Sequence, residues 1–331
     1  MQEQFDLISI GDSTIDLFME VDVEDAHTVC TLDNDRCVVC FGYGSKVPVK
    51  KMTRVAAVGN AANSAIGSSR LGLKTAIYTV IGSDQDSQEM RKIFKEEDVD
   101  TSFVVMESGK RSNLSVVLNY NSERTIFVYH EDRNYNLPKF PGAKWIYYTS
   151  VAKGHDILHK QVPEYIRSSG AKLAFNPGSY QLREGPPALA PILEITEVLL
   201  LNREEAHFLV GGDLEDAKGL IAKLKRKGPQ IVVMTDGKNG SFASFDGREV
   251  WHVGIPQDSP VLEMTGAGDA YSTGFLAALA QGTEIPEAMV CGTMNATSVV
   301  QYVGAREGLL TPQKMQEFMK EYGQFVKPKM I

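Results

Sequence analysis

The chain has 331 residues, 43% of them hydrophobic and 23% charged, which is ordinary for a globular enzyme with one large α/β domain and an appendage, or with two modest domains. Its 34 Lys and Arg against 42 Asp and Glu give a net charge of -8, which argues against nucleic acid as the main partner because the chain has no basic excess to neutralise phosphates. The sequence has neither an apolar run of membrane-spanning length nor a secretory signal in residues 1–10, so we expect a cytoplasmic protein with no membrane partner and with its four cysteines as thiols.

The first predicted element is a buried strand at residues 5–10, a short apolar run that ends at Gly11. Asp16 lies in the polar segment that follows, and open α/β sheets bind ligands just past the carboxyl ends of their strands. The Asp16 carboxylate is therefore either an acceptor for hydrogen bonds from substrate hydroxyls or an ordinary turn residue.

Residues 17–55 show no helical period, and segments 17–23 and 37–41 have the composition of strands. This region also holds side chains of the kinds that bind zinc, namely His27, Cys30, Cys37 and Cys40. Apolar residues fill the space between the last two, which fits strand thiols better than a metal site, so we predict no structural zinc. Residues 111–130 alternate around a turn at 121–124, and we predict that they join 17–55 in one β unit.

Small residues at 57–65 predict a helix start against which a ligand can lie. Gly59 and Asn63 are the candidate contacts there, and plain small-residue packing is the alternative. Further on, residues 73–81 predict a strand, and residues 84–97 predict an amphipathic helix that buries Met90, Ile93 and Phe94.

Strands and helical or loop segments alternate after residue 142. The predicted strands are 144–149, 172–176, 197–201 and 230–235. This alternation indicates a parallel sheet with helices on both faces.

Two segments after these strands carry candidate binding residues. Asn202 and Glu205 are three residues apart on one helix face, where they could order a hydrated Mg²⁺ or a phosphate, or simply form a capping box. The segment from Thr235 to Gly240 is either a simple turn or a nucleotide-binding loop.

The segment 263–271, with the sequence EMTGAGDAY, predicts a tight loop that runs into a buried helix. Gly266 and Gly268 flank Ala267 and allow backbone N–H groups to approach a ligand, and a helix N-terminus attracts phosphate. Asp269 could take the proton from an attacking hydroxyl beside that phosphate, or it could be only an N-cap.

The sequence TGAGDAYSTGF in this region resembles the C-terminal signature of the ribokinase-like, PfkB-type carbohydrate and nucleoside kinases. Three other stretches, around Asp16, Asn63 and Asn202, resemble the family's segments in the same order, so the resemblance covers nearly the whole chain. It implies a ribokinase-like three-layer α/β core with a mostly parallel sheet, formed by 1–16, 56–110 and 131–331. It also implies a small β-sheet lid formed by 17–55 and 111–130.

The resemblance implies a role for each candidate residue. Asp269 would be the catalytic base, and the N–H groups of Gly266, Ala267 and Gly268 would hold the charge of the transferring phosphoryl group. Asp16, Gly59 and Asn63 would bind the acceptor, and Glu205 would act through Mg²⁺. ATP would contact Asn202, Thr235, Gly237, Gly240 and Asn295. Two departures stand out: Val58 replaces a usual Gly, and Glu263-Met264 replaces the dipeptide beside a monovalent-cation site found in some relatives, so such a cation stays an open question.

We therefore predict phosphoryl transfer from ATP to a hydroxyl of a sugar or sugar-like substrate. The alternatives are a nucleoside kinase and, more distantly, a sugar- or nucleotide-binding regulator without turnover. A dinucleotide-dependent oxidoreductase is disfavoured because an early Gly-x-Gly-x-x-Gly fingerprint is missing. The edges of a lid sheet could pair with a second subunit, which suggests a homodimer.

Overall fold

The computed structural model describes residues 4–331 apart from 23, 25, 32–36 and 121–122. Its main sheet contains β1 (Phe5–Ile10), β6 (Thr75–Ile81), β7 (Val99–Asp100), β8 (Val104–Met106), β11 (Ala143–Tyr148), β12 (Lys172–Phe175), β13 (Val198–Asn202), β14 (Ile231–Thr235), β15 (Ser241–Ser244), β16 (Trp251–Val253) and β17 (Lys329–Met330). Among the described residues the order is β17-β16-β15-β14-β13-β12-β11-β1-β6-β7, with β8 also paired to β6. Neighbours from β14 to β7 run parallel, and β15, β16 and β17 add an antiparallel edge. The predicted mostly parallel sheet is confirmed.

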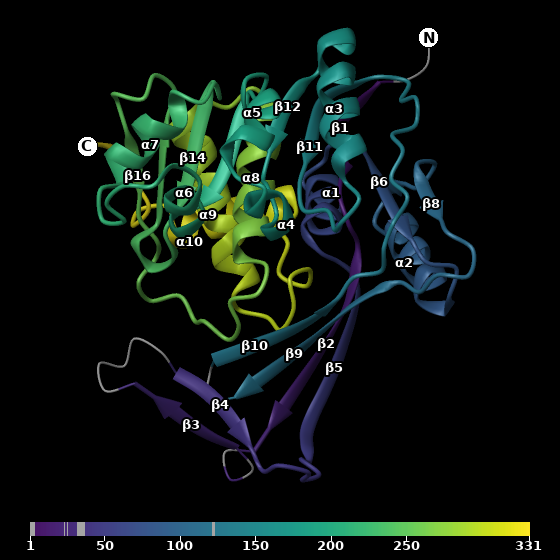
Figure 1. Ribbon diagram of the computed structural model, residues 1–331. Helices are drawn as coiled ribbons and strands as arrows, with labels where there is room; N and C mark the ends of the chain where they lie inside the picture. Colours follow the sequence, from purple (N-terminus) through teal and green to yellow (C-terminus); the bar gives the residue numbers. More distant parts are fainter. Residues whose placement is uncertain (1–3, 23, 25, 32–36, 121–122) are drawn as a thin grey trace.

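Helices cover both faces of this sheet, because successive side chains of each strand point to opposite sides. In β1, Ile8 and Ile10 pack in one core while Leu7 packs in the other. The first core holds α3 (Asp156–Ser169), α4 (Ser179–Arg183), α5 (Pro186–Leu193), α6 (Arg203–Val210) and α7 (Ala217–Lys225). The opposite face is covered by α1 (Asn60–Arg70), α2 (Gln85–Glu96), α8 (Ala267–Ala280), α9 (Ile285–Val299) and α10 (Pro312–Tyr322). The core is therefore the three-layer α/β arrangement that we predicted (Figure 1).

Each helix that packs on the sheet presents a buried stripe, and α2 shows why. Its N-cap Asp84 accepts a hydrogen bond from the Ser87 N–H, and the helix buries Met90 and Phe94 completely, as predicted from their spacing. Within the described part of the chain, no helix combines the length and the apolar character that crossing a membrane requires.

A second, smaller sheet lies beneath the core in Figure 1. It contains β2 (Thr14–Val21), β5 (Val49–Val58), β9 (Asn113–Tyr120) and β10 (Glu123–Tyr129), in the order β10-β9-β2-β5. Its strands come from the two separated stretches that we predicted, although β2 and β5 extend past the boundaries at 17 and 55. Residues 23, 121 and 122 of the predicted strand and turn lie outside the described residues.

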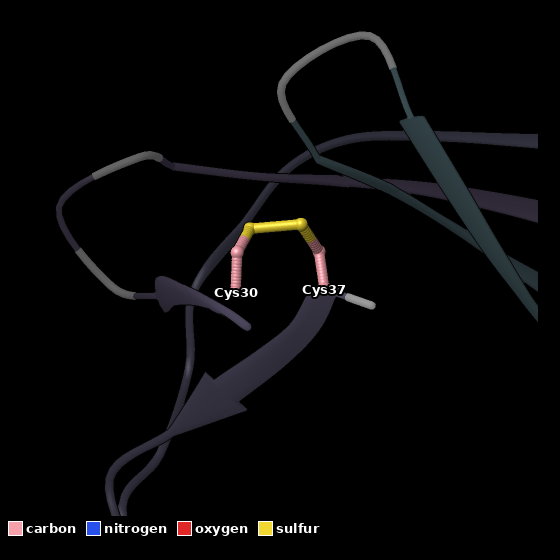
Figure 2. Close-up of a disulfide and its surroundings, with 2 residues drawn as sticks. All are labelled: Cys30 and Cys37. Atoms are coloured by element: carbon pink, nitrogen blue, oxygen red, sulfur yellow. A yellow bond between two sulfur atoms is a disulfide. The ribbon is translucent and has the colours of Figure 1, made fainter. Parts of the chain in front are cut away.

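The prediction of a single sheet is wrong for β3 (Ala26–Cys30) and β4 (Cys37–Phe41). These strands form a separate two-stranded sheet, in which Cys30 pairs with Cys37 in the antiparallel register. The prediction of four thiols is also wrong, because these two cysteines form a disulfide (Figure 2). Directly opposed positions on antiparallel strands bring the Cα atoms to 4.0 Å, close enough for a bridge. Cys40 and Cys291 are free, and the cytoplasmic location stays a prediction.

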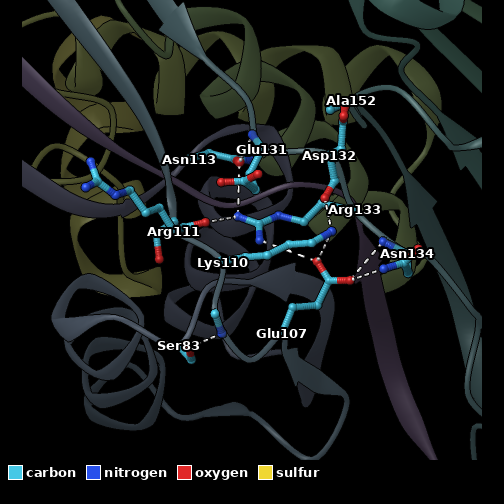
Figure 3. A network of polar contacts seen from close by, with 12 residues as sticks. Ser83, Glu107, Lys110, Arg111, Asn113, Glu131, Asp132, Arg133, Asn134 and Ala152 are labelled. Atoms are coloured by element: carbon cyan, nitrogen blue, oxygen red, sulfur yellow. Dashed lines mark hydrogen bonds and ion pairs between the residues drawn. The ribbon is translucent and has the colours of Figure 1, made fainter.

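A polar network joins the small sheet to the core where β9 begins and the chain leaves β10 (Figure 3). Arg133 is central to it: its guanidinium donates to the Arg111 carbonyl at 2.5 Å and to Asn113 Oδ1 at 3.2 Å, and lies 3.5 Å from Glu107. A second bond joins the same two segments, because Lys110 donates to the Asp132 carbonyl. Because a buried guanidinium is costly without such partners, these contacts fasten the two connecting segments to each other.

Candidate active site

The candidate site lies where parallel strands of the main sheet end. Each strand in the series β1, β11, β12, β13 and β14 pairs in parallel with the next. The residues that follow these strands therefore lie together along the carboxyl ends of the sheet. Polar residues stand at these ends, namely Asp12, Thr149, Asn176, Asn202 and Thr235. Ligands of open α/β sheets bind at this edge, so the strand order alone places the polar residues where a ligand is expected.

The N-terminus of α8 opens toward the same edge. Gly266 is the N-cap and has φ of +81°, and a Cβ atom there would lie 2.2 Å from the Ala305 Cβ, so only glycine fits. The Ala267 N–H donates to the Met264 carbonyl at 3.3 Å. Gly268 differs, because a Cβ there would meet nothing within 4 Å. The missing side chain at Gly268 therefore leaves open space beside helix N–H groups that lack intrahelical acceptors.

Asp269 lies in the first turn of α8, behind the N-cap Gly266. Its Oδ2 accepts a hydrogen bond from Asn63 Nδ2 at 2.8 Å, so the carboxylate bonds to a side chain of α1 rather than capping its own helix. Burial raises the pKa of Asp269 to about 6, and the Asn63 hydrogen bond offsets this only in part. A carboxylate with this pKa is ionised at neutral pH yet holds a proton better than an exposed aspartate, as a general base requires.

Asp16 lies on β2 of the small sheet and faces the same space, with only 8% of its surface exposed. Burial raises its pKa to about 6, and the charges of Asp269 and Glu263 add to the rise, while a hydrogen bond with Ser115 opposes it. Glu263 is held by the Thr265 backbone N–H at 2.8 Å. Three carboxylates from distant parts of the sequence therefore converge between the small sheet and the N-terminus of α8.

A cation from the small sheet reaches into this acidic region. Arg124 on β10 places Nη1 3.7 Å from Glu263 Oε1. Because Arg124 lies on β10 and Glu263 lies in the loop before α8, this ion pair links the small sheet to that loop.

A cavity of about 110 Å³ is lined by several of the predicted residues. Its lining consists of Asn60, Asn176, Leu200, Leu201, Asn202, Glu205, Thr235, Gly268, Asp269 and Ser272. Five of these were candidates from the sequence, drawn from three separate motifs. The fold thus brings the phosphate-site, metal-site and base candidates to one place.

Asn202 and Glu205 form the capping box and also face this cavity. The Asn202 N–H donates to Glu205 Oε2 at 2.9 Å, and the Glu205 N–H donates to Asn202 Oδ1 at 2.8 Å. Burial raises the pKa of Glu205, and the charges of Glu204 and Asp269 add to the rise. The capping box and a role in binding Mg²⁺ are therefore compatible, since a carboxylate at a helix start can cap it and still present an oxygen to a hard cation.

The loop after β14 contains two glycines with different roles. A Cβ on Gly237 would meet nothing within 4 Å, whereas a Cβ on Gly240 would lie 2.0 Å from the Val253 carbonyl oxygen. Gly240 is thus required by packing against β16, while Gly237 leaves room for a ligand. A cavity of about 750 Å³ borders this loop, lined in part by Arg203, Asp236 and Lys238.

The remaining candidates lie around the site or away from it. Gly59 is the N-cap of α1, with φ of +95°, and supports the helix that carries Asn63. Asn295 is fully buried, donates to the Ala270 carbonyl at 2.7 Å and accepts from the Leu310 N–H at 2.9 Å. Both polar groups of its side chain are used inside the protein, so the structure does not bring Asn295 to the site.

Sequence reasoning missed Asn176 as a site residue. Its Oδ1 accepts from Asn60 Nδ2 at 3.2 Å, and its own Nδ2 donates to the Leu200 carbonyl at 2.8 Å. The signal was present, because Asn176 ends a predicted strand as Thr235 does, and Asn202 directly follows another.

Comparison with known proteins identifies what this arrangement belongs to. Residues 27–312 match the family described as pfkB family carbohydrate kinase. An Archaeoglobus fulgidus protein described as an uncharacterized sugar kinase is 30% identical over 252 residues, which cover 74% of this chain and 98% of that protein. A Methanothermobacter thermautotrophicus nucleoside kinase is 25% identical over 319 residues, which cover 94% of this chain and 93% of that protein.

A solved structure agrees with the fold. Arabidopsis thaliana ribokinase, complexed with ribose and ATP, matches with a TM-score of 0.78 at 17% identity, over 96% of this chain and 99% of that chain. The chain belongs to the pfkB carbohydrate kinase family, ribokinase-like ATP-dependent phosphotransferases with an alcohol group as acceptor.

Proposed function

We propose that this kinase transfers the γ-phosphoryl group of ATP to a hydroxyl of a sugar or sugar-like acceptor, with Asp269 as the base. The observation that supports this most is the position of Asp269, bonded to Asn63 beside the open N-terminus of α8. A nucleoside is the second candidate acceptor, because the Methanothermobacter relative that matches 94% of this chain is a nucleoside kinase.

In the proposed reaction, Asp269 takes the proton of the acceptor hydroxyl as its oxygen attacks the γ-phosphorus, and the bond to the ADP oxygen breaks. The backbone N–H groups of Gly266 and Gly268 stabilise the charge on the transferring group, beside the Ala267 N–H that donates to the Met264 carbonyl. Asp16 accepts hydrogen bonds from other acceptor hydroxyls, while Gly59 and Asn63 shape the acceptor side and Asn63 orients Asp269. Asn202, Thr235 and Gly237 form the nucleotide side, and Gly240 holds their loop by packing against β16.

Glu205 is the proposed magnesium residue. Its carboxylate lines the cavity with oxygen and amide groups, which is the donor set that Mg²⁺ prefers. When bound, Mg²⁺ would neutralise phosphate charge. Glu263 supplies a carboxylate beside the loop where some relatives bind a monovalent cation. The assay described below therefore compares activity with and without such an ion.

Residues 17–55 and 111–130 are the proposed lid. Arg124 reaches Glu263 at 3.7 Å from this lid, and the Arg133 network anchors its base to the core. Closure would exclude water and so favour transfer to the acceptor over hydrolysis of ATP.

The acceptor class is tested by ADP release from Mg-ATP with a panel of sugars, sugar acids and nucleosides, with and without K⁺. A sugar should give the highest kcat/KM. A nucleoside that exceeds every sugar by tenfold or more would instead identify the second candidate.

The pH profile provides a prediction for this site. Asp269 must be ionised to accept a proton, and the pKa values of Asp269 and Asp16 are both raised to about 6. We expect kcat/KM to fall as pH drops through about 6, by about tenfold or more per unit in the acid limit. ATP affinity over the same range is the control, and a level kcat/KM down to about pH 5 would contradict this assignment.

Glu205→Gln should raise the Mg²⁺ concentration needed for half-maximal rate, with little change in melting temperature. Glutamine keeps an oxygen for the Asn202 N–H but removes the charge that binds the cation. Titrating Mg²⁺ at fixed ATP measures this, and Glu204→Gln on the exposed side of the same helix is the matched control. If the Mg²⁺ dependence is the same in both variants, Glu205 only caps α6.

The lid is also the proposed homodimer surface. β10 is an edge strand that exposes four apolar side chains, Ile126, Phe127, Val128 and Tyr129. Phe127 lies opposite Val116, whereas Val128 lies opposite Ser115, which interacts with Asp16, so Phe127 is on the face away from the site.

Phe127→Lys should therefore shift the protein from dimer to monomer in sedimentation velocity, because a buried lysine lacks a partner there. Phe208→Lys changes an equally exposed phenylalanine on α6 and should leave the dimer intact. A wild-type protein that is monomeric at micromolar concentration would contradict the proposal.

A further inference from the structure

A group of three side chains outside the proposed active site has the composition of a metal centre. His155 is the N-cap of α3, His159 follows one turn later, and Glu184 lies at the end of α4 (Figure 1). Each offers one ligand atom, and these atoms all lie within 4.8 Å of one another. A spacing of four residues puts both imidazoles on one helix face.

His155 is held in the orientation that a ligand needs. Its Nδ1 lies 2.7 Å from the Ala152 carbonyl oxygen, which is only an acceptor, so Nδ1 carries a proton. Nε2 then points at Glu184 Oε1, 3.0 Å away. A backbone carbonyl that fixes the tautomer of one ring nitrogen while the other faces the ligand is the usual outer support of a metal-bound histidine.

His159 brings a second nitrogen to the same carboxylate. Its Nδ1 lies 3.6 Å from Glu184 Oε2, and the ring is largely buried. Among the described residues, the Nε2 atom of His159 is buried and has no hydrogen-bond partner.

Two imidazole nitrogens and a carboxylate therefore converge in a largely buried place. In the described part of the chain, His155 Nε2 has no partner with hydrogen-bond geometry, and His159 Nδ1 lies beyond hydrogen-bond distance of Glu184 Oε2. A divalent cation would satisfy all three electron-pair donors at once.

We propose that His155, His159 and Glu184 bind a divalent transition-metal ion, with Zn²⁺ as the best match to a donor set of two histidines and one carboxylate. Glu184 is the most exposed of the three side chains, so a water molecule can complete the coordination from its side.

The position of the site suggests what the ion does. Ala152, whose carbonyl orients His155, also donates its N–H to Asp12 Oδ2 at 2.9 Å. Tyr135 donates to the other oxygen of Asp12 at 2.7 Å. A metal ion at the cluster would therefore fix the segment that positions Asp12, in the loop before the acceptor residue Asp16.

The test measures binding of Zn²⁺ alone to chelator-treated full-length protein, with the disulfide oxidised and Cys40→Ser as the background so that the exposed thiol does not compete. We expect one ion per chain, a rise in melting temperature, and a tetrahedral d–d spectrum with Co²⁺. His159→Gln and Glu184→Gln should each weaken binding by about a hundredfold or more, while His207→Gln on α6 should not.

Competition with a chromophoric chelator gives the affinities, and circular dichroism confirms that each variant is folded. The Co²⁺ spectrum of the background protein tests the site without any substitution in the cluster. Absence of saturable binding, or equal binding by the cluster variants and His207→Gln, would overturn the proposal and leave only a direct contact between His155 and Glu184.

Discussion

Asp269→Asn should fold, bind ATP and turn over its acceptor about a hundredfold to ten-thousandfold more slowly than the wild-type chain, the usual cost of losing a positioned base. Asparagine has nearly the same shape and keeps an oxygen for the hydrogen bond from Asn63. ATP affinity should hold or rise slightly, because a negative charge beside the phosphates is gone.

The stability of the same variant distinguishes a catalytic role from a structural one. Burial raises the pKa of Asp269 to about 6, so the folded protein binds this proton more tightly than the unfolded chain does. The ionised carboxylate therefore destabilises the fold at pH values above its folded pKa, by on the order of 3 kcal/mol. Asp269→Asn should melt at the wild-type temperature or higher at pH 7.5, and closer to wild type at pH 5.

The matched control is Asp213→Asn, an exposed aspartate in the loop after α6. It should change neither turnover nor melting temperature. A folded Asp269→Asn that binds ATP and works within a few-fold of wild type would show that another group takes the proton.

Asp16→Asn should lower kcat/KM by about a hundredfold, mainly through a higher KM for the acceptor, since a hydrogen bond to a charged group contributes about 1.5–3 kcal/mol. Asparagine retains one acceptor oxygen but loses the charge, and its amide group donates where a substrate hydroxyl must donate. KM for ATP should be unchanged, because Asp16 lies on the small sheet rather than in the loop after β14.

Asp16→Asn is measured by varying the acceptor at saturating Mg-ATP. Ser115→Ala is its companion, because it removes only the hydrogen bond that opposes the raised pKa of Asp16. That variant should move the acid limb of the pH profile to higher pH with a small change in KM. Equal KM values for the acceptor in Asp16→Asn and wild type would remove Asp16 from the acceptor site.

The parts of the fold that follow from local pattern could be predicted from the sequence. Buried parallel strands such as Val198–Asn202 are continuous apolar runs with a polar residue at the end, so both strand and site residue are visible in the sequence. The Gly268-Asp269 start of α8 is equally local. Asn176 also stands as a polar residue at the end of an apolar strand, but it was not predicted as a site residue.

What depends on strand register or on distant contacts could not be predicted. The Cys30–Cys37 bridge needs the register of β3 with β4, and their separation from the small sheet depends on pairings outside the local sequence. Asn295 lies on a helix rich in small residues, which suggested a ligand contact, yet helix packing buries it fully. The bond from Asn63 to Asp269 joins positions 206 residues apart, so only the fold shows that Asn63 donates to the proposed base.

The central claim, that the phosphoryl group passes to the acceptor and not to water, is tested most directly by ³¹P NMR of Mg-ATP turnover with the best acceptor of the panel. We predict one phosphate ester for each ADP, no rise in inorganic phosphate, and the loss of both products with Asp269→Asn. Inorganic phosphate formed in step with ADP, or ester formed at the wild-type rate by Asp269→Asn, would contradict it.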